Sequence, residues 1–397
     1  MGTIIFICKL KNLFAKIKLM KLYHIFIFLL PLSVNAQVRT YLIQGKLKQP
    51  INGRVYLFSD VIEKKYYGRN PVLDSAKLIE GKFRFKRIMY QDAWSIPYRL
   101  AIQSDSFQGT TDMILIEQKN QTIIIDSLSD YIAPVIIKSS FQDELKNEYE
   151  VFFKPFVLRA NILEIYADSL YSSKESLPKE ALQKLVQMQN HQSIEGDSLF
   201  YSYAKMHPNS TVTLWKLIER FSNLGYKNIY SDIFKLLKDS LKRSEPGQLL
   251  MHDLNAAKLL AIGNIFPILK LKDTSRKTIF LDTRNSHSKY ILIDFWFSSC
   301  APCLREFPSY KKLYYQYHNV GFEIIGISID TKKDILKWKE VIKKQNLSWN
   351  QYLDEDNKLS KKLFINTFPT NLLIDKNGRI IKKNITKMEL EEYLLKL

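Results

Sequence analysis

The chain has 397 residues, of which 46% are hydrophobic and 13% aromatic, which is enough for two or three domains with their own cores. This composition excludes a disordered chain and a small fold held together by disulfides. The formal net charge is +19, but Lys and Arg are spread among Asp and Glu without a dense basic run or a nucleic-acid motif, so we expect a lysine-rich solvated surface and no nucleic-acid partner.

Residues 1–36 have the pattern of a signal peptide. A basic stretch ends at Lys21, an apolar run follows from Ile25 to Leu32, and Ser33-Val34-Asn35-Ala36 is a small-residue cleavage pattern. The apolar run is shorter than the roughly 20 residues that a membrane-spanning helix needs. We therefore predict cleavage before Gln37 and export to the periplasm or cell envelope.

Cleavage would change both the charge and the cysteine content. Residues 1–36 carry five lysines and no acidic residue, so their loss lowers the net charge from +19 to +14. A second start at Met20 would give a more compact signal peptide. Cys8 is removed in either case, and no cysteine stands at the cleavage point to accept a lipid anchor. The mature chain would keep Cys300 and Cys303 as its only thiols.

Residues 37–139 are predicted to form a β-rich domain. Short alternating apolar runs are separated by turn signals such as Asn52-Gly53 and Glu80-Gly81, a pattern typical of an antiparallel sandwich. The predicted strands are Arg39 to Leu47, Arg54 to Phe58, Ala76 to Ile79, Lys82 to Arg87, Tyr98 to Ile102, Met113 to Glu117 and Thr122 to Ile125.

Residues 140–262 change to a helical period. Leu158, Ile162 and Ile165 recur at the spacing of one helix face, which predicts that they belong to a core. Further helices are predicted over Val212 to Leu224 and Ile229 to Leu241, and helix breaks at Pro178, Pro208 and Pro246. The histidines of this segment lack the spacing of metal ligands, so we expect structural or surface roles for His191, His207 and His252.

Residues 263–397 alternate between strand and helix and predict a small mixed α/β sheet. A parallel strand–helix–strand unit is followed by an antiparallel hairpin around Lys376-Asn377-Gly378 and by a closing helix. The predicted strands are Ile291 to Phe297, Gly321 to Ile329, Asn371 to Asp375 and Arg379 to Lys383; the predicted helices are Cys303 to Tyr317, Lys332 to Gln345 and Lys387 to Leu395.

The motif Cys300-Ala301-Pro302-Cys303 directly follows the first of these strands. Two cysteines three positions apart at the start of a helix form a dithiol/disulfide couple, because the positive end of the helix stabilises the first thiolate. Without a second Cys or His pair nearby they make a poor metal site, so we expect neither a stable metal nor another cofactor. Pro302 suits the first helical turn, where its missing N–H costs nothing.

The residues around this motif resemble a known family. Ile293-Asp294-Phe295-Trp296 before the cysteines, Leu304-Arg305-Glu306-Phe307-Pro308 after them and the distant Phe368-Pro369-Thr370 resemble the thioredoxin-like, extracytoplasmic thiol-disulfide oxidoreductases of the TlpA/ResA type. The resemblance covers about the last 135 residues. The segment ahead of it resembles the β-rich domain of unknown function that precedes thioredoxin domains in many exported bacterial proteins.

The resemblance implies roles for single residues. Cys300 attacks, and Cys303 resolves the mixed disulfide. Asp294 matches the buried acid of thioredoxins, which with a raised pKa takes the proton from Cys303; a solvent-exposed strand end is the alternative. Glu306 matches an acid that tunes the second cysteine, although a solvated helix residue remains an equal alternative.

Further residues are implied at the substrate side. A cis peptide bond between Phe368 and Pro369 would leave the backbone of Phe368 free to pair with substrate, and Pro302 would help to set the redox potential. Trp296 matches a tryptophan that packs and covers the site. Ser299 departs from the family, which often has Trp there, and so removes hydrophobic cover beside Cys300.

The leading functional hypothesis is an exported oxidoreductase that exchanges disulfides with protein substrates, as a reductant fed by a membrane thiol transporter. Cytochrome c maturation is one known use of the related group. One alternative is a thiol peroxidase, for which Ser298 and Ser299 before Cys300 would fit but the nearby Cys303 fits less well. The other is an envelope binding or scaffolding protein with a minor redox role.

Overall fold

The computed structural model describes residues 39–59, 64–67, 73–89, 96–111, 113–126, 128, 132–133, 135–137, 139–172 and 179–397. The predicted signal peptide, Cys8 and the predicted break at Pro178 lie outside the described residues. All described secondary structure belongs to one unit, Thr40–Leu397.

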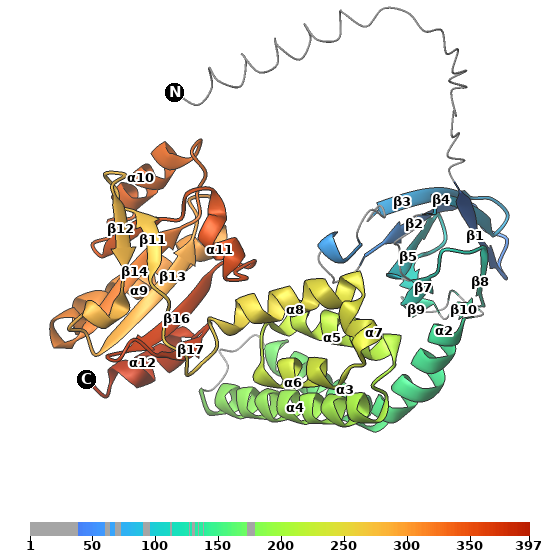
Figure 1. Cartoon of the computed structure of the whole chain (residues 1–397), viewed down its shortest axis with the longest axis horizontal. Helices are drawn as coiled ribbons and strands as arrows, with labels where there is room; N and C mark the ends of the chain where they lie inside the picture. The colour runs from blue at the N-terminus through green and yellow to red at the C-terminus, as the bar shows by residue number, and fades with distance from the viewer. Residues whose placement is uncertain are drawn as a thin grey trace, which may run out of the picture. The chain divides into compact units, whose positions relative to one another are not determined.

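The amino-terminal part of this unit consists of two β-sheets with a common core. The first has the strand order β10-β8-β1-β4, and the second has the order β3-β2-β5-β6-β9 with β7 paired to β5 (Figure 1). Their bounds are β1 Thr40–Leu47, β2 Gly53–Phe58, β3 Leu73–Leu78, β4 Lys82–Ile88, β5 Ile96–Ser104, β6 Gln108–Thr111, β7 Ile114–Ile116, β8 Gln121–Ile125, β9 Ile132–Ala133 and β10 Val135–Ile137, with a 3-10 turn at Lys64–Tyr67.

Alternation of apolar and polar residues explains these sheets. Along β1 every second side chain is buried, including Ile43, and the same holds for Phe83 and Phe85 in β4. These side chains join residues of the second sheet, such as Val55 and Leu100, in one hydrophobic cluster. The predicted β-rich domain is present, but its sheets are not purely antiparallel, because β1 pairs with β8 and β6 with β9 in parallel.

The middle part is helical, as predicted. Its helices are α2 Ser140–Glu144, α3 Glu150–Tyr171, α4 Lys179–Met206, α5 Thr211–Leu224, α6 Asn228–Leu236, α7 Asp239–Arg243 and α8 Glu245–Lys258, with a π-helical turn η2 at Leu145–Tyr149 between α2 and α3. The predicted break at Pro208 separates α4 from α5. Pro246 instead lies in the first turn of α8, where a proline fits.

Two predictions for the helical part are wrong. Leu158, Ile162 and Ile165 share a face of α3 as predicted, but they are 56%, 68% and 69% exposed, because the buried contact to α4 is made by Leu163 and Ala167 on another face. The single helix predicted over Ile229 to Leu241 is also interrupted. Leu237 takes an extended conformation and separates α6 from α7, while its side chain stays buried.

The carboxyl-terminal part is a mixed, thioredoxin-like sheet with the order β12-β11-β15-β14-β13-β16-β17. The strand bounds are β11 Leu269–Lys272, β12 Thr278–Leu281, β13 Tyr290–Trp296, β14 Phe322–Ser328, β15 Asn350–Leu353, β16 Thr370–Asp375 and β17 Ile380–Lys383. The helices are α9 Ala301–Tyr317, α10 Ile335–Lys344, α11 Lys358–Lys362 and α12 Lys387–Leu394, with 3-10 turns at Thr283–Asn285, His318–Val320 and Glu355–Asn357.

The two faces of β13 are covered by different clusters. Ile291, Ile293 and Phe295 point into one cluster, whereas Leu292 and Trp296 point into the cluster that contains the buried face of α9. Because successive side chains of a strand alternate between faces, residue 294 must also point towards α9. This alternation decides which side chains can lie beneath the cysteines.

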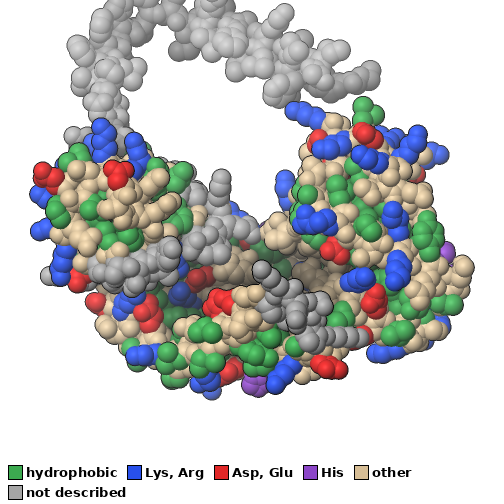
Figure 2. Space-filling view, turned by 180° about the vertical axis from the view of Figure 1, so that it is seen from behind, with side chains coloured by type: hydrophobic (Ala, Val, Ile, Leu, Met, Phe, Trp, Pro, Cys, Tyr) green, Lys and Arg blue, Asp and Glu red, His purple; other side chains and the backbone are tan. Residues whose placement is uncertain are grey.

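Charged side chains of both signs are dispersed over the face of the molecule in Figure 2. Figure 2 shows Lys and Arg scattered among Asp and Glu over the face that it presents, without a continuous basic patch. Among the described residues, no helix has both the length and the apolar character needed to cross a membrane.

Candidate active site

Cys300 lies at the junction between the central strand β13 and helix α9. It is the residue before the first helical turn, and its sulfur accepts a hydrogen bond from the backbone N–H of Cys303 at 3.2 Å. Pro302 occupies the first turn of the helix. The sulfur thus lies at the positive end of the helix, where a thiolate is stabilised.

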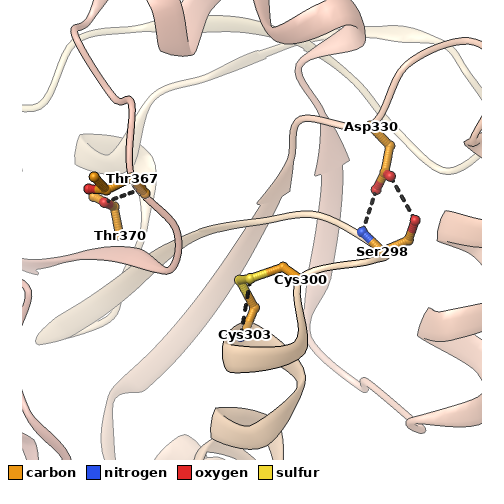
Figure 3. Close-up of a disulfide and its surroundings, with 6 residues drawn as sticks. All are labelled: Ser298, Cys300, Cys303, Asp330, Thr367 and Thr370. Atoms are coloured by element: carbon orange, nitrogen blue, oxygen red, sulfur yellow. Dashed lines mark hydrogen bonds between the residues drawn. A yellow bond between two sulfur atoms is a disulfide. The ribbon is translucent and has the colours of Figure 1, made fainter. Parts of the chain in front are cut away.

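Cys300 and Cys303 form a disulfide, so the structure represents the oxidised protein (Figure 3). Both residues are almost wholly buried, at 3% and 1% exposed. Ser299 is exposed, as its polar side chain suggests, but Cys300 is covered all the same. It belongs to the apolar cluster of Trp296, against which Phe297 and Phe368 pack.

Asp294 lies on the face of β13 that points towards α9. It is 2% exposed, which excludes the alternative of a solvent-exposed strand end, and its Oδ1 has no hydrogen-bond partner among the described residues. Burial, and next the negative charge of Glu306, raise the pKa of Asp294 to about 7. A carboxyl group with such a pKa can release or accept a proton near neutral pH.

Glu306 and Tyr310 extend this group along α9. Glu306 is half-buried and lies close enough for its charge to act on Asp294. Burial, and next the charge of Asp294, raise the pKa of the Tyr310 hydroxyl well above its usual value, and this hydroxyl accepts a hydrogen bond from the Asn371 side chain at 3.2 Å. Asn371 stands opposite Asp294 in the neighbouring strand β16.

Trp296 packs, as predicted, but cannot contact a substrate as it lies. Its side chain is 0% exposed, stacks edge-on against Phe307 and donates from Nε1 to Oε1 of Gln351 at 3.1 Å. Gln351 in turn lies against Gly326 of β14, where a Cβ atom would come within 2.2 Å of the same Oε1. Trp296 is therefore a core residue beneath the cysteines in this oxidised structure, and its role in substrate binding stays a prediction.

The loop before β16 contains the expected cis peptide bond between Phe368 and Pro369. Both residues are half-buried, and the ring of Phe368 meets that of Phe297 edge-on at 5.6 Å. Thr370 closes the loop by donating a hydrogen bond to the carbonyl oxygen of Thr367 at 2.7 Å (Figure 3). Pro302 is exposed, so it and the edge of Phe368 offer surface beside the cysteines.

Asp330 is a buried residue of the site that the sequence reasoning missed. Its carboxylate accepts hydrogen bonds from the backbone N–H of Ser298 at 2.9 Å and from the Ser298 hydroxyl at 2.7 Å (Figure 3). The Ser328 hydroxyl donates a third hydrogen bond to it at 2.6 Å. These bonds hold the backbone two residues before Cys300. The predicted parallel strands could have indicated this contact. Because β13 and β14 are parallel, the residues that follow their carboxyl ends lie at the same edge of the sheet.

Among the described residues, no cluster of metal-ligating side chains surrounds the cysteine motif. Among the described side chains, the group of His, Cys, Asp and Glu that is close enough to share a metal ion is Glu144, Glu148 and His207, in the helical part. The groups at this site that can take part in thiol-disulfide exchange and proton transfer are the two cysteines and the buried carboxyl group of Asp294, whose pKa is about 7.

Residues 262–383 match the model of the AhpC/TSA family, a range that includes both cysteines and the cis-proline loop. Thiol-disulfide oxidoreductase ResA of Bacillus cereus is 31% identical over 141 residues, which cover 35% of this chain and 79% of that protein. ResA of Bacillus thuringiensis subsp. konkukian is 33% identical over 141 residues, with the same two coverages of 35% and 79%.

Solved structures include similar chains. The thioredoxin domain of a thiol-disulfide oxidoreductase from Bacteroides vulgatus has 28% sequence identity and a TM-score of 0.30, covering 34% of this chain and 98% of that chain. A thiol:disulfide interchange protein from Bacteroides sp. has 31% identity and a TM-score of 0.31, covering 34% and 90%. These matches concern about a third of the chain.

Proposed function

Because this chain belongs to the ResA-type thiol-disulfide oxidoreductases, we propose that it reduces disulfides in protein substrates through Cys300 and Cys303. The observation that carries the proposal is the place of Cys300 before the first turn of α9, where the Cys303 N–H donates to its sulfur. The reaction needs no cofactor beyond the two cysteines.

The exchange proceeds in two steps from the reduced protein. The Cys300 thiolate attacks one sulfur of the substrate disulfide, so that a mixed disulfide forms and the other substrate sulfur leaves as a thiolate. Cys303 then loses its proton and attacks the Cys300 sulfur, which releases the second substrate thiolate. The substrate gains two electrons and, with two protons, becomes a dithiol, while the protein becomes the disulfide form.

Asp294 is the proposed acceptor of the Cys303 proton. Its support is its position on the α9-facing side of β13 and a pKa of about 7, which matches a proton acceptor that works near neutral pH. Glu306 acts on this step through its charge, which helps to raise the pKa of Asp294. Both roles follow the resemblance as well as the geometry.

The substrate is proposed to bind along Phe368 and Pro369, with Pro302 at its side. The resemblance supplies the expectation that the backbone of Phe368 pairs with an extended segment of the substrate. The half-buried Phe368 and the exposed Pro302 support it, because they leave surface next to otherwise buried cysteines. An extended peptide on backbone hydrogen bonds suits many protein substrates.

Export and the electron donor are part of the same proposal. The amino-terminal pattern up to Ala36 supports secretion into the periplasm or envelope, where a reductant must be recharged from outside that compartment. We propose a membrane thiol transporter as the donor and apocytochrome c maturation as one use. Amino-terminal sequencing of the envelope protein should begin at Gln37, and an uncleaved chain would contradict export by this route.

Two measurements test the exchange reaction. Insulin reduction with dithiothreitol as the electron source should fall to the uncatalysed rate in Cys300→Ser. Cys303→Ser expressed in the native envelope should accumulate mixed disulfides through Cys300, and the double variant should have none. Recovery of no adducts that depend on Cys300 would contradict the proposal for protein substrates.

The same variants separate the two alternatives. A thiol peroxidase would turn over rapidly at low peroxide concentration and lose that activity in Cys300→Ser, whereas the proposed reductase should not. A binding or scaffolding protein would keep its envelope function in Cys300→Ser. Either of these results would replace the proposal.

A further inference from the structure

Two carboxylates and an imidazole converge in the helical part, away from the cysteine motif in sequence. Glu144 ends α2, Glu148 belongs to the π-helical turn η2, and His207 directly follows α4. One ligand atom from each of the three side chains lies within 4.8 Å of the others. His207 was expected to have a structural or surface role, because the histidines of this segment lack the spacing of metal ligands.

The local structure concentrates negative charge at this point. Glu144 and Glu148 are four positions apart on one continuous helical segment, a spacing at which like charges repel. Lys146 between them pairs with Glu150 at 3.0 Å. Nδ1 of His207 lies 3.3 Å from Oε2 of Glu148. A π-helical turn, as at η2, is a local irregularity that often marks a functional site.

The hydroxyl of Tyr203 points to a missing ligand. Tyr203 is 0% exposed and its ring stacks on His207 with centroids 4.2 Å apart, yet its hydroxyl has no hydrogen-bond partner of normal geometry among the described residues. The hydroxyl is directed at the Glu144 carboxylate, with which it makes a hydrogen-bonding contact outside normal geometry. A buried hydroxyl is seldom left without a partner.

The orientation of Glu144 is also fixed from behind. Ser210 donates its hydroxyl to Oε1 of Glu144, and the same Ser210 oxygen accepts the backbone N–H of Thr213 at 2.9 Å as it caps α5. Hydrogen bonds that orient a carboxylate in this way are typical of the surroundings of metal ligands.

We propose that Glu144, Glu148 and His207 bind one divalent transition-metal ion of the Zn²⁺ type. Two carboxylates and one imidazole form a ligand set that suits such an ion and disfavours Ca²⁺, which prefers oxygen ligands only. Three protein ligands leave a position for water, and a water there would give the Tyr203 hydroxyl a hydrogen-bond partner of normal geometry. The ion would neutralise the two glutamates and tie α2 and η2 to the junction between α4 and α5.

The proposal is tested by calorimetric titration of the full chain with ZnCl₂. The protein is first stripped with a chelator and kept oxidised, so that Cys300 and Cys303 cannot supply thiolate ligands. We expect one ion per chain with a dissociation constant in the micromolar range or below, and a higher Tm in Zn²⁺ that Ca²⁺ does not produce. No saturable binding, or equal binding of Ca²⁺, would overturn the site.

Variants locate the ion. Glu148→Gln and His207→Gln should each weaken Zn²⁺ binding by about tenfold or more. Replacing a residue that only hydrogen-bonds to a metal ligand already lowers metal affinity by about 10- to 100-fold. The matched controls Glu150→Gln and His191→Gln replace exposed residues of the same helical part and should bind Zn²⁺ as the wild type does. Equal Zn²⁺ affinity in all four variants would refute the assignment.

Folding and redox activity are checked on the same samples. Glu148 is about half exposed, with 52% of its side-chain surface accessible, so its replacement should leave the far-ultraviolet circular dichroism unchanged. Insulin reduction should persist in every variant, because the cysteines lie in another part of the chain. A loss of Zn²⁺ binding in a folded, active Glu148→Gln protein therefore supports the site, and its failure leaves the redox proposal untouched.

Discussion

Asp294 and Asp330 belong to two regions that flank the strand ends at the cysteines, and their surroundings differ sharply. Asp294 lies beneath α9 and Asp330 follows β14; they are 2% and 5% exposed. Oδ1 of Asp294 has no partner among the described residues, whereas the carboxylate of Asp330 accepts three hydrogen bonds, two of them from Ser298.

The difference indicates two kinds of buried acid beside one reactive pair. Burial, and next the charge of Glu306, raise the pKa of Asp294 to about 7, so this carboxyl group can exchange a proton near neutral pH. An acid whose oxygens are occupied by donors holds the backbone that leads to Cys300 instead. Burial alone does not distinguish the two; their hydrogen-bond partners do.

The largest expected effect is on stability against pH. Because burial raises the pKa of Asp294 from 3.8 to about 7, the folded protein holds this proton more tightly than the unfolded chain. The protonated carboxyl group contributes its full share to the free energy of unfolding below about pH 4. As the pH rises through 7 this contribution, about 4 kcal/mol in total, is lost. Urea unfolding of the oxidised protein from pH 4 to 9 should show this loss.

Asp294→Asn is the matched control for that measurement. Its stability should lack this loss between pH 4 and 8 and should exceed that of the wild type at pH 9. A variant that follows the wild-type curve would show that another group causes the pH dependence.

The next effect is on the rate of exchange. Without the carboxylate, Cys303 loses its proton acceptor, so Asp294→Asn should slow the resolving step by about 100-fold at pH 8. Stopped-flow fluorescence of the reduced protein with a disulfide peptide from pH 5 to 9 measures it. The wild-type rate should rise with a midpoint near pH 7. If Asp294→Asn shows the same midpoint, a group other than Asp294 causes the pH dependence of the rate.

Asp330→Asn should mainly destabilise the protein. It replaces a buried acceptor of three hydrogen bonds by an amide that has one acceptor atom, at a cost of about 2 kcal/mol. The midpoint near pH 7 should stay, since Asp294 is intact. The exposed Asp232→Asn is the control and should change stability by less than about 0.5 kcal/mol; a shifted midpoint in Asp330→Asn would remove the distinction between the two acids.

The smallest effect is expected from Glu306→Gln. The negative charge of Glu306 is the second cause of the raised pKa of Asp294, after burial. Neutralising it should therefore move the midpoint of the rate profile to lower pH by less than about one unit. An upward shift would contradict the electrostatic coupling of the two residues.

Local patterns predicted most of the fold. Alternation of apolar residues identified β1 and β4, and the turn at Lys376-Asn377-Gly378 identified the hairpin of β16 and β17. Strands with polar sequences were missed, namely β6, with Gln108-Gly109-Thr110-Thr111, and β15, because their pairing depends on neighbours in the sheet. The stripe at Leu158 was predicted to be buried, since periodicity identifies a helix face but not what covers it.

What the sequence determined by itself about this protein is its redox chemistry. The order strand, Cys300, Pro302, Cys303 contains the helix start and the thiol pair within a few residues, and the alternation along β13 places Asp294 on the side of α9.

The tertiary structure alone decided which distant side chains meet. Asp330 binds Ser298 across 32 residues of sequence, and His207 reaches Glu144 and Glu148 across about 60. Such contacts depend on how distant strands and helices pack, and local sequence patterns do not predict that packing.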